Sequence, residues 1–210
     1  EIDTNLSKIA AHNFEQLNKK NIICLAENGL EYLKKSTEIF DVIYIDPSRR
    51  NDVKEKVFLL KDCEPNIPEN IDLLFKKTKT ILLKNSPILD ITSAINELKF
   101  VKEIHVVAIN NDVKELLYIL EKGYCKEILI KTINFTKKSA QKFHFNYHKK
   151  PVSSYQEPLE YLYEPNAAVL KSGAFHEIST QLNIFKLHQH SHLYTSKKRI
   201  EFPGREFKII

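Results

Sequence analysis

Apolar residues along the first 150 positions fall into two patterns, continuous runs and three- or four-residue spacings. The continuous runs at residues 22–25, 40–45, 80–83 and 104–109 predict strands. Residues 40–45 have little polar alternation, which predicts burial on both faces of that strand. Helical spacing separates the runs and covers residues 6–17, 30–33, 71–77, 91–98 and 113–120, with Gly123 as the stop of the last helix.

Two alternating runs at residues 128–135 and 143–147 predict a β-hairpin. Strand–helix repetition that ends in such a pair predicts an α/β fold with a Rossmann-like, doubly wound sheet. Residues 149–154 are polar and interrupt both patterns, so we expect two domains, residues 1–150 and 151–210. The second is expected to be a small α+β domain, with strands at residues 159–163, 184–194 and 200–209 and a helix at 167–182.

The composition excludes several classes of protein. No apolar run approaches the roughly 18–20 residues that a membrane helix needs. Cys24, Cys63 and Cys125 are odd in number and widely spaced, which argues against a disulfide framework or a zinc motif and predicts a cytoplasmic protein. The chain has four Gly and no Met, so we expect a longer protein whose N-terminus lies upstream of Glu1.

Positive charge is concentrated in the last third of the chain. The net charge is +5, but it is −1 from Glu1 to Asn134 and +6 from Phe135 to Ile210. Clustered cations are typical of a nucleic-acid-binding domain, although a solvated basic surface would give the same balance. Cations and aromatic residues also alternate near the C-terminus, namely Tyr194, Lys197, Lys198, Arg199, Phe202, Arg205, Phe207 and Lys208.

Four segments carry polar residues that would stand at the ends of strands, at residues 1–3, 27–29, 46–50 and 85–87. Ligands of open α/β sheets bind beyond the carboxyl ends of the strands, where an acid can bind a cofactor ribose. The competing interpretation is that such residues close turns or cap helices. Arg49 and Arg50 are the more informative pair, because adjacent guanidinium groups after a buried strand favour an anionic ligand over an exposed basic turn.

A second candidate cluster is histidine-rich. His188, His190 and His192 alternate within a predicted strand and would share one face. Without a Cys or carboxylate at matching spacing, a polar strand face is favoured over a metal site, and no metal ligand is assigned.

Five segments resemble bacterial class I S-adenosylmethionine-dependent methyltransferases with a C-terminal THUMP-like domain, namely EIDTNLSKIAAHNF, IICLAENGLEYL, DVIYIDPSRR, YLYEPNAAVLKSGAF and FPGREFKI. The resemblance extends over nearly the whole chain. It implies that Glu1 binds the cofactor ribose, that Glu27 or Asn28 lies beside the adenine, and that Asp46-Pro47 occupies the place of the (Asp/Asn)-Pro-Pro-(Tyr/Phe) motif.

Two departures accompany the resemblance. The Gly-rich cofactor loop, which belongs just before Glu1, is absent, so the sheet is expected to be incomplete at its N-terminus and residues 1–210 alone to be inactive. Ser48 and Arg49 replace the second Pro and the aromatic residue of the motif. In the implied reaction Asp46 orients an attacking amine, while Arg49 and Arg50 bind a phosphate or carboxylate of the substrate.

The resulting prediction is a methyltransferase that acts on RNA, either tRNA or rRNA, with S-adenosyl-L-methionine as its cofactor. The alternative is a non-catalytic RNA-binding or scaffold protein on a degenerate sheet, which the missing glycine loop favours. A nicotinamide-dependent oxidoreductase would also need a ribose-binding acid, but it leaves residues 46–50 and the basic region without a role.

Overall fold

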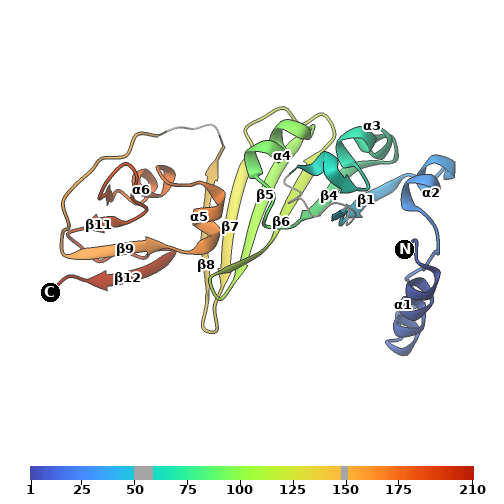
Figure 1. Cartoon of the computed structure of the whole chain (residues 1–210), viewed down its shortest axis with the longest axis horizontal. Helices are drawn as coiled ribbons and strands as arrows, with labels where there is room; N and C mark the ends of the chain where they lie inside the picture. Colours follow the sequence, from blue (N-terminus) through green and yellow to red (C-terminus); the bar gives the residue numbers. More distant parts are fainter. Residues whose placement is uncertain (50–58, 148–150) are drawn as a thin grey trace.

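The computed structural model describes residues 1–49, 59–147 and 151–210. A large sheet lies between helix α1 (Thr4–Gln16) at one end and a smaller sheet at the other (Figure 1). Among the described residues, no helix combines the length and apolar character that crossing a membrane requires.

The large sheet contains six strands of the described chain. Their spatial order is β1 (Phe40–Ile45), β4 (Thr78–Asn85), β6 (Asp112–Glu121), β5 (Val101–Ile109), β7 (Leu129–Phe135) and β8 (Ala140–Asn146). β1, β4, β5 and β7 run in one direction, and β6 and β8 run in the other. The predicted α/β class with a Rossmann-like sheet is therefore confirmed, as is the β7–β8 hairpin at its edge.

The helix predicted over residues 113–120 is wrong, because this segment is strand β6. Asn110 and Asn111 have φ values of 50° and 65°, the left-handed conformations that a two-residue hairpin turn requires. They join β5 directly to β6. Leu116, Tyr118 and Leu120 are fully buried with a period of two, as expected for one face of a strand. The apolar residues that match a helical spacing therefore come from both faces of this strand.

Helices α3 (Ile67–Lys77) and α4 (Ile91–Glu97) follow the predicted positions, although α3 begins earlier than residue 71. Asn66 caps α3 and Pro68 occupies its first turn, where the missing N–H costs no hydrogen bond. Asp90 caps α4 by accepting a hydrogen bond from Ser93 N at 2.7 Å. The short helix η1 (Leu60–Asp62) packs beside both helices.

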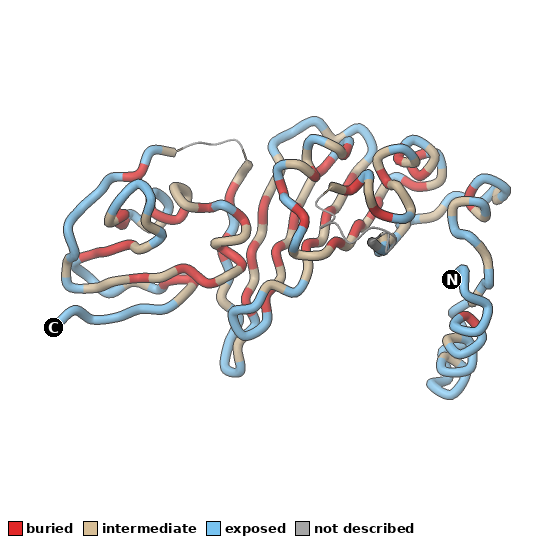
Figure 2. The backbone as a smooth tube through the Cα atoms, viewed as in Figure 1, coloured by how far each residue is buried: buried red, intermediate tan, exposed pale blue. Residues whose placement is uncertain are grey.

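The core lies along one face of the large sheet, and buried residues, red in Figure 2, recur along the central strands. Ile81, Leu83, Ile104 and Val106 are fully buried there. Residues of the opposite face are half-buried and include charged side chains such as Glu103. Period-two alternation in β4 and β5 thus divides an apolar face from a polar one.

The N-terminal region departs most from the predictions. Strand β1 was expected to be buried on both faces, but it is an edge strand of the described sheet, with Val42 47% and Tyr44 58% exposed. Residues 22–25 were predicted as a strand and have no strand assignment, because they lack neighbouring strands within the described chain. Helix α1 is also mostly exposed (Figure 2), including its apolar Leu6 and Ile9.

The smaller sheet has the order β10 (Phe185–Lys186), β11 (Tyr194–Ser196), β9 (Tyr161–Pro165) and β12 (Gly204–Lys208). The single helix expected at residues 167–182 is divided into α5 (Ala167–Ser172) and α6 (Glu177–Gln181), because Gly173 leaves the helix with φ 77°.

The histidine cluster does not lie on a strand. His188, His190 and His192 occupy the loop between β10 and β11, so the expectation of a shared strand face is wrong. The rings of His192 and Phe175 stack with their centroids 4.0 Å apart. No three His, Cys, Asp or Glu side chains lie close enough to hold a metal ion in the part of the chain that the structure describes.

A network of amide side chains joins the two sheets. Asn134 Nδ2 and Asn166 Nδ2 both donate to Gln141 Oε1, at 3.0 and 3.2 Å, and Gln141 Nε2 donates to the Gly204 carbonyl at 2.8 Å. Asn111 Oδ1 accepts a hydrogen bond from Ala167 N, and Asn166 Oδ1 caps α5. The segment YEPNAAVLKSGAF therefore fixes α5 against β5, β6 and β7.

Candidate functional site

The carboxyl ends of β1 and β4 meet at one edge of the large sheet. The two strands are parallel neighbours, with Ile45 opposite Leu83, so the residues that follow each strand lie side by side. They line a cavity of about 290 Å³. Its wall comprises Asp46, Pro47, Ser48, Cys63, Lys84, Asn85, Ser86, Pro87, Leu89 and Lys114.

Short-range pairing holds the segment after Asp46-Pro47. Strand β2 (Ser48–Arg49) pairs with β3 (Cys63–Glu64), and Ser48 Oγ donates a hydrogen bond to the Glu64 carbonyl at 3.3 Å. Cys63 is buried against the cavity. Ser48 and Cys63 both line the cavity, so this pairing forms part of its wall.

An ion pair crosses the cavity wall. Lys84 Nζ lies 2.7 Å from Asp46 Oδ2, and both side chains are partly exposed. The hydrogen bond from Lys84 to Asp46 raises the pKa of the Lys84 ammonium, with a smaller opposing effect of burial. Lys84 therefore keeps its charge at neutral pH and fixes the position of the Asp46 carboxylate.

Lys114 brings a second ammonium group to the same wall. Because β6 runs antiparallel to β4, with Leu116 opposite Asn85, the start of β6 lies at the carboxyl end of β4. Lys114 Nζ lies 2.5 Å from Asp112 Oδ2, a pair whose side chains are more than half exposed. The cavity thus has two cations and one carboxylate on its wall.

Sequence reasoning assigned no role to Asn85, although it grouped residues 85–87 with the other polar segments. Asn85 is 2% exposed, and its Nδ2 has no hydrogen-bond partner among the described residues. Most buried amides are satisfied, so this group is exceptional. The sequence signal for a role of Asn85 is its position, at the end of a predicted buried strand and directly before Ser86-Pro87.

The predicted cofactor residues near the N-terminus form a second group. The Glu1 amino group donates to the Leu25 carbonyl at 3.3 Å, and Glu27 N donates to the Glu1 carbonyl at 2.9 Å. Glu1 and Glu27 are therefore adjacent. Asn28 Oδ1 accepts from Leu30 N and caps α2 (Gly29–Lys35), which is the cap role weighed against ligand binding for such residues.

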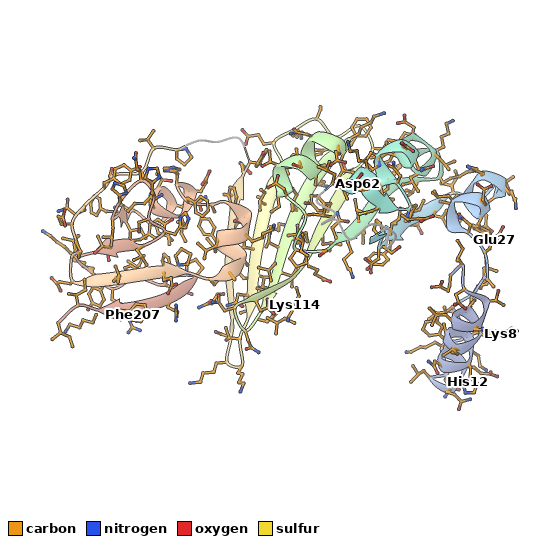
Figure 3. The ribbon with its side chains drawn as sticks, in the orientation of Figure 1. Lys8, His12, Glu27, Asp62, Lys114 and Phe207 are labelled. Atoms are coloured by element: carbon orange, nitrogen blue, oxygen red, sulfur yellow. The ribbon has the colours of Figure 1, made fainter. Side chains whose placement is uncertain are left out.

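The two groups of predicted residues do not share one cavity. Glu1, Glu27 and Asn28 are absent from the wall around Asp46 and Pro47. Figure 3 shows Glu27 near α2, well away from Lys114. Of the two predicted anion-binding residues, Arg49 has its backbone in β2 opposite Cys63, while Arg50 lies outside the described residues.

The aromatic residues of the basic C-terminal region serve different purposes. Tyr194 and Phe202 are buried in the small-sheet core, whereas Phe207 is 46% exposed (Figure 3) with the Arg205 guanidinium 5.9 Å from its ring centroid. Arg205 also pairs with Glu164 and Arg199 with Glu206. Lys197 and Lys198 instead line a groove of about 590 Å³.

Comparison with known proteins gives two likenesses and no match among curated proteins. Residues 161–203 match the model of a ferredoxin-like domain. The crystal structure of a "putative methyltransferase" from Porphyromonas gingivalis W83 is 34% identical, with a TM-score of 0.72 over 81% of this chain. The chain spans 43% of that protein, so the likeness is to less than half of its length.

Proposed function

We propose that this protein is an S-adenosyl-L-methionine-dependent methyltransferase that reacts at the cavity beyond β1 and β4. The observation that carries the proposal is the meeting of Asp46-Pro47 with residues 84–87 at the carboxyl edge of two parallel strands. The likeness to a structure described as a methyltransferase supports the same reaction class.

The cofactor would be held by the N-terminal group. Glu1 and Glu27 are adjacent through backbone hydrogen bonds, which suits the pairing of a ribose-binding acid with a polar residue beside adenine. Asn28 is next to them. Asp46 with Pro47 would line the methyl-bearing end, so the proposal requires the bound cofactor to extend from the N-terminal group to the separate cavity beyond β1 and β4. The bound cofactor supplies a methyl group activated by a sulfonium.

The chain's own contribution to the reaction is positioning. Lys84 holds Asp46 through Oδ2, and Oδ1 is the atom proposed to accept a hydrogen bond from an attacking amine. Such a bond directs the lone pair of the nucleophile along the transfer path and raises the share of near-attack geometries. Pro47 has no N–H to compete for the carboxylate and stiffens the turn that carries it.

The proposed substrate is RNA, either tRNA or rRNA. Residues 135–210 have a net charge of +6, and no described carboxylate lines the groove beside Lys197 and Lys198. Phe207 adds an exposed aromatic ring on which a base can stack. We also propose that residues 151–210 form a THUMP-like domain beside a methyltransferase domain at residues 1–150. Arg49 and Arg50 would bind a phosphate or carboxylate of the substrate. The protein would act in the cytoplasm.

We further propose that additional polypeptide covers the N-terminal region of this fold. The surface concerned is the outer edge of β1 together with α1 and residues 22–25. Large apolar side chains are exposed there, including Ile2, Leu6, Ile9, Ile22, Ile23, Leu25, Ile39, Val42 and Tyr44. Exposed large apolar side chains of this kind mark an interface, and a strand added to the edge of β1 would pair its free backbone groups.

The test is calorimetry of the full-length protein with S-adenosylhomocysteine, with and without bulk tRNA and rRNA, followed by methyl transfer to those RNAs. We expect the protein to bind S-adenosylhomocysteine and to transfer methyl groups to the RNA. The Asp46→Ala variant is expected to lose methyl transfer without a change in melting temperature. RNA binding without S-adenosylhomocysteine binding would favour the non-catalytic RNA-binding protein. Undiminished transfer by Asp46→Ala would remove Asp46 from the reaction.

A further inference from the structure

The side chain of Asn85 is a buried hydrogen-bond donor on the wall of the cavity. On the same face of β4, Ile81 and Leu83 are fully buried and apolar, so the amide interrupts an otherwise apolar row. Its Nδ2 has no partner within the described chain, so no described group compensates its loss of hydration. A ligand that accepts a hydrogen bond from this group would recover that loss.

The neighbouring charges indicate the kind of ligand. Lys84 and Lys114 line the same cavity. Lys84 points to the other face of β4. Lys114 lies two residues before Leu116, the partner of Asn85, and so on the same face as the amide. The partner of Lys114, Asp112, is not part of the wall. The cavity therefore combines a neutral donor for an uncharged acceptor atom with cations suited to a phosphate.

We propose that Asn85 determines specificity for the methyl acceptor, with Nδ2 donating to a ring nitrogen or exocyclic oxygen of a nucleobase. Lys114 binds a phosphate of the same nucleotide. This inference rests on the proposed function and narrows its substrate to a base inserted in the cavity. A volume of about 290 Å³ accommodates one base-sized ring and excludes a folded stretch of RNA.

The chain offers a matched control in Asn134. Asn134 is 3% exposed, but its Oδ1 accepts from Asn111 N at 2.9 Å and its Nδ2 donates to Gln141 at 3.0 Å. A structural amide of this kind stabilises the free protein. An unsatisfied buried amide that binds a ligand destabilises the ligand-free protein. Replacing it with an apolar residue therefore removes the desolvation cost and raises the stability.

The experiment compares Asn85→Leu and Asn134→Leu in the full-length protein. Without ligand, we expect the melting temperature to rise by about 2–4 °C for Asn85→Leu and to fall by a similar amount for Asn134→Leu. The four nucleoside 5′-monophosphates serve as probes in titration calorimetry. Asn85→Leu is expected to lower the affinity for the tightest-binding nucleotide at least about tenfold. Asn85→Asp replaces the donor with an acceptor and is expected to lower that affinity by a similar factor.

The outcomes separate this inference from the proposed function. A fall in melting temperature for Asn85→Leu, or nucleotide affinity equal to wild type in both Asn85 variants, would overturn the role of Asn85. Absence of nucleotide binding by the wild-type protein would overturn it as well. Nucleotide binding that depends on Asn85, in a protein that transfers no methyl group to tRNA or rRNA, would support the inference and contradict the methyltransferase proposal.

Discussion

Lys84 Nζ and Asp46 Oδ2 lie 2.7 Å apart across the carboxyl ends of β4 and β1. Because the pair is partly exposed, Lys84→Met should change the free energy of unfolding by no more than about 1 kcal/mol. It frees the Asp46 carboxylate to rotate, so we expect methyl transfer by the full-length protein to fall about 10- to 100-fold. Steady-state kinetics and thermal unfolding measure the two effects.

Lys99→Met is the control for this prediction. Lys99 Nζ lies 2.9 Å from Asp72 on an exposed surface outside the cavity wall. Its loss should alter neither kinetics nor stability measurably. Equal activities of Lys84→Met and wild type would show that the ion pair does not position Asp46.

Gly204 permits the close approach of β12 to β9. A Cβ at this position would overlap the Glu164 carbonyl and press on the Phe202 ring. We expect Gly204→Ala to separate the strands and destabilise the protein by about 1–3 kcal/mol in urea unfolding. Gly29→Ala is the control, because a Cβ there meets open space at the start of α2. Equal midpoints for Gly204→Ala and wild type would contradict the close packing.

Tyr118 is fully buried in the large-sheet core, and its hydroxyl has no hydrogen-bond partner among the described residues. Burial raises the pKa of this hydroxyl well above its ordinary value. Tyr118→Phe should therefore stabilise the protein by about 1 kcal/mol. Tyr194→Phe should destabilise it by about the same amount, because the Tyr194 hydroxyl donates to the Phe175 carbonyl at 2.8 Å. Differential scanning calorimetry of both variants decides the sign, and a loss of stability in Tyr118→Phe would contradict the prediction.

Glu103 makes part of the stability pH-dependent. Burial opposes its ionisation, but hydrogen bonds with His105 and Lys131, at 2.9 and 2.6 Å, outweigh that effect and lower the pKa of Glu103. Its contribution is complete above the unfolded-state pKa of about 4.3 and disappears as the pH falls through the lower folded-state pKa. We expect Glu103→Gln to be less stable than wild type at pH 7, and the difference to shrink as the pH is lowered below about 4, as measured by urea unfolding. A stability difference independent of pH would contradict this assignment.

The sequence was sufficient for most of the sheet but not for β6. Strands 40–45, 80–83 and 104–109 are recognisable from continuous apolar runs, a pattern that is local in the sequence even though the strands pair with distant residues. In β6 the apolar residues of a half-buried strand happen to match a helical spacing. The Asn110-Asn111 turn was the local signal for a hairpin, because Asn tolerates positive φ more readily than most residues.

Part of the candidate site was also predictable. The proximity of residues 46–47 to residues 85–87 follows from parallel strands, whose carboxyl ends meet at one edge. The Lys84–Asp46 pair and the contribution of Lys114 could not be predicted, because both depend on the order of β1, β4 and β6. The cofactor and substrate roles of Glu1, Glu27, Asn28, Asp46, Pro47, Arg49 and Arg50 stay predictions.

The insertion of β6 between β4 and β5 has a consequence for how the fold assembles. Within the described chain, β4 and β5 share no backbone hydrogen bonds, and each is bonded to β6. The sheet therefore becomes continuous only after the later-synthesised β6 has paired on both sides. Unfolding of β6 would divide the sheet into a β1–β4 half and a β5–β7–β8 half. Because each half depends on β6 for its pairing, both halves are expected to lose structure together with β6 in a single cooperative transition.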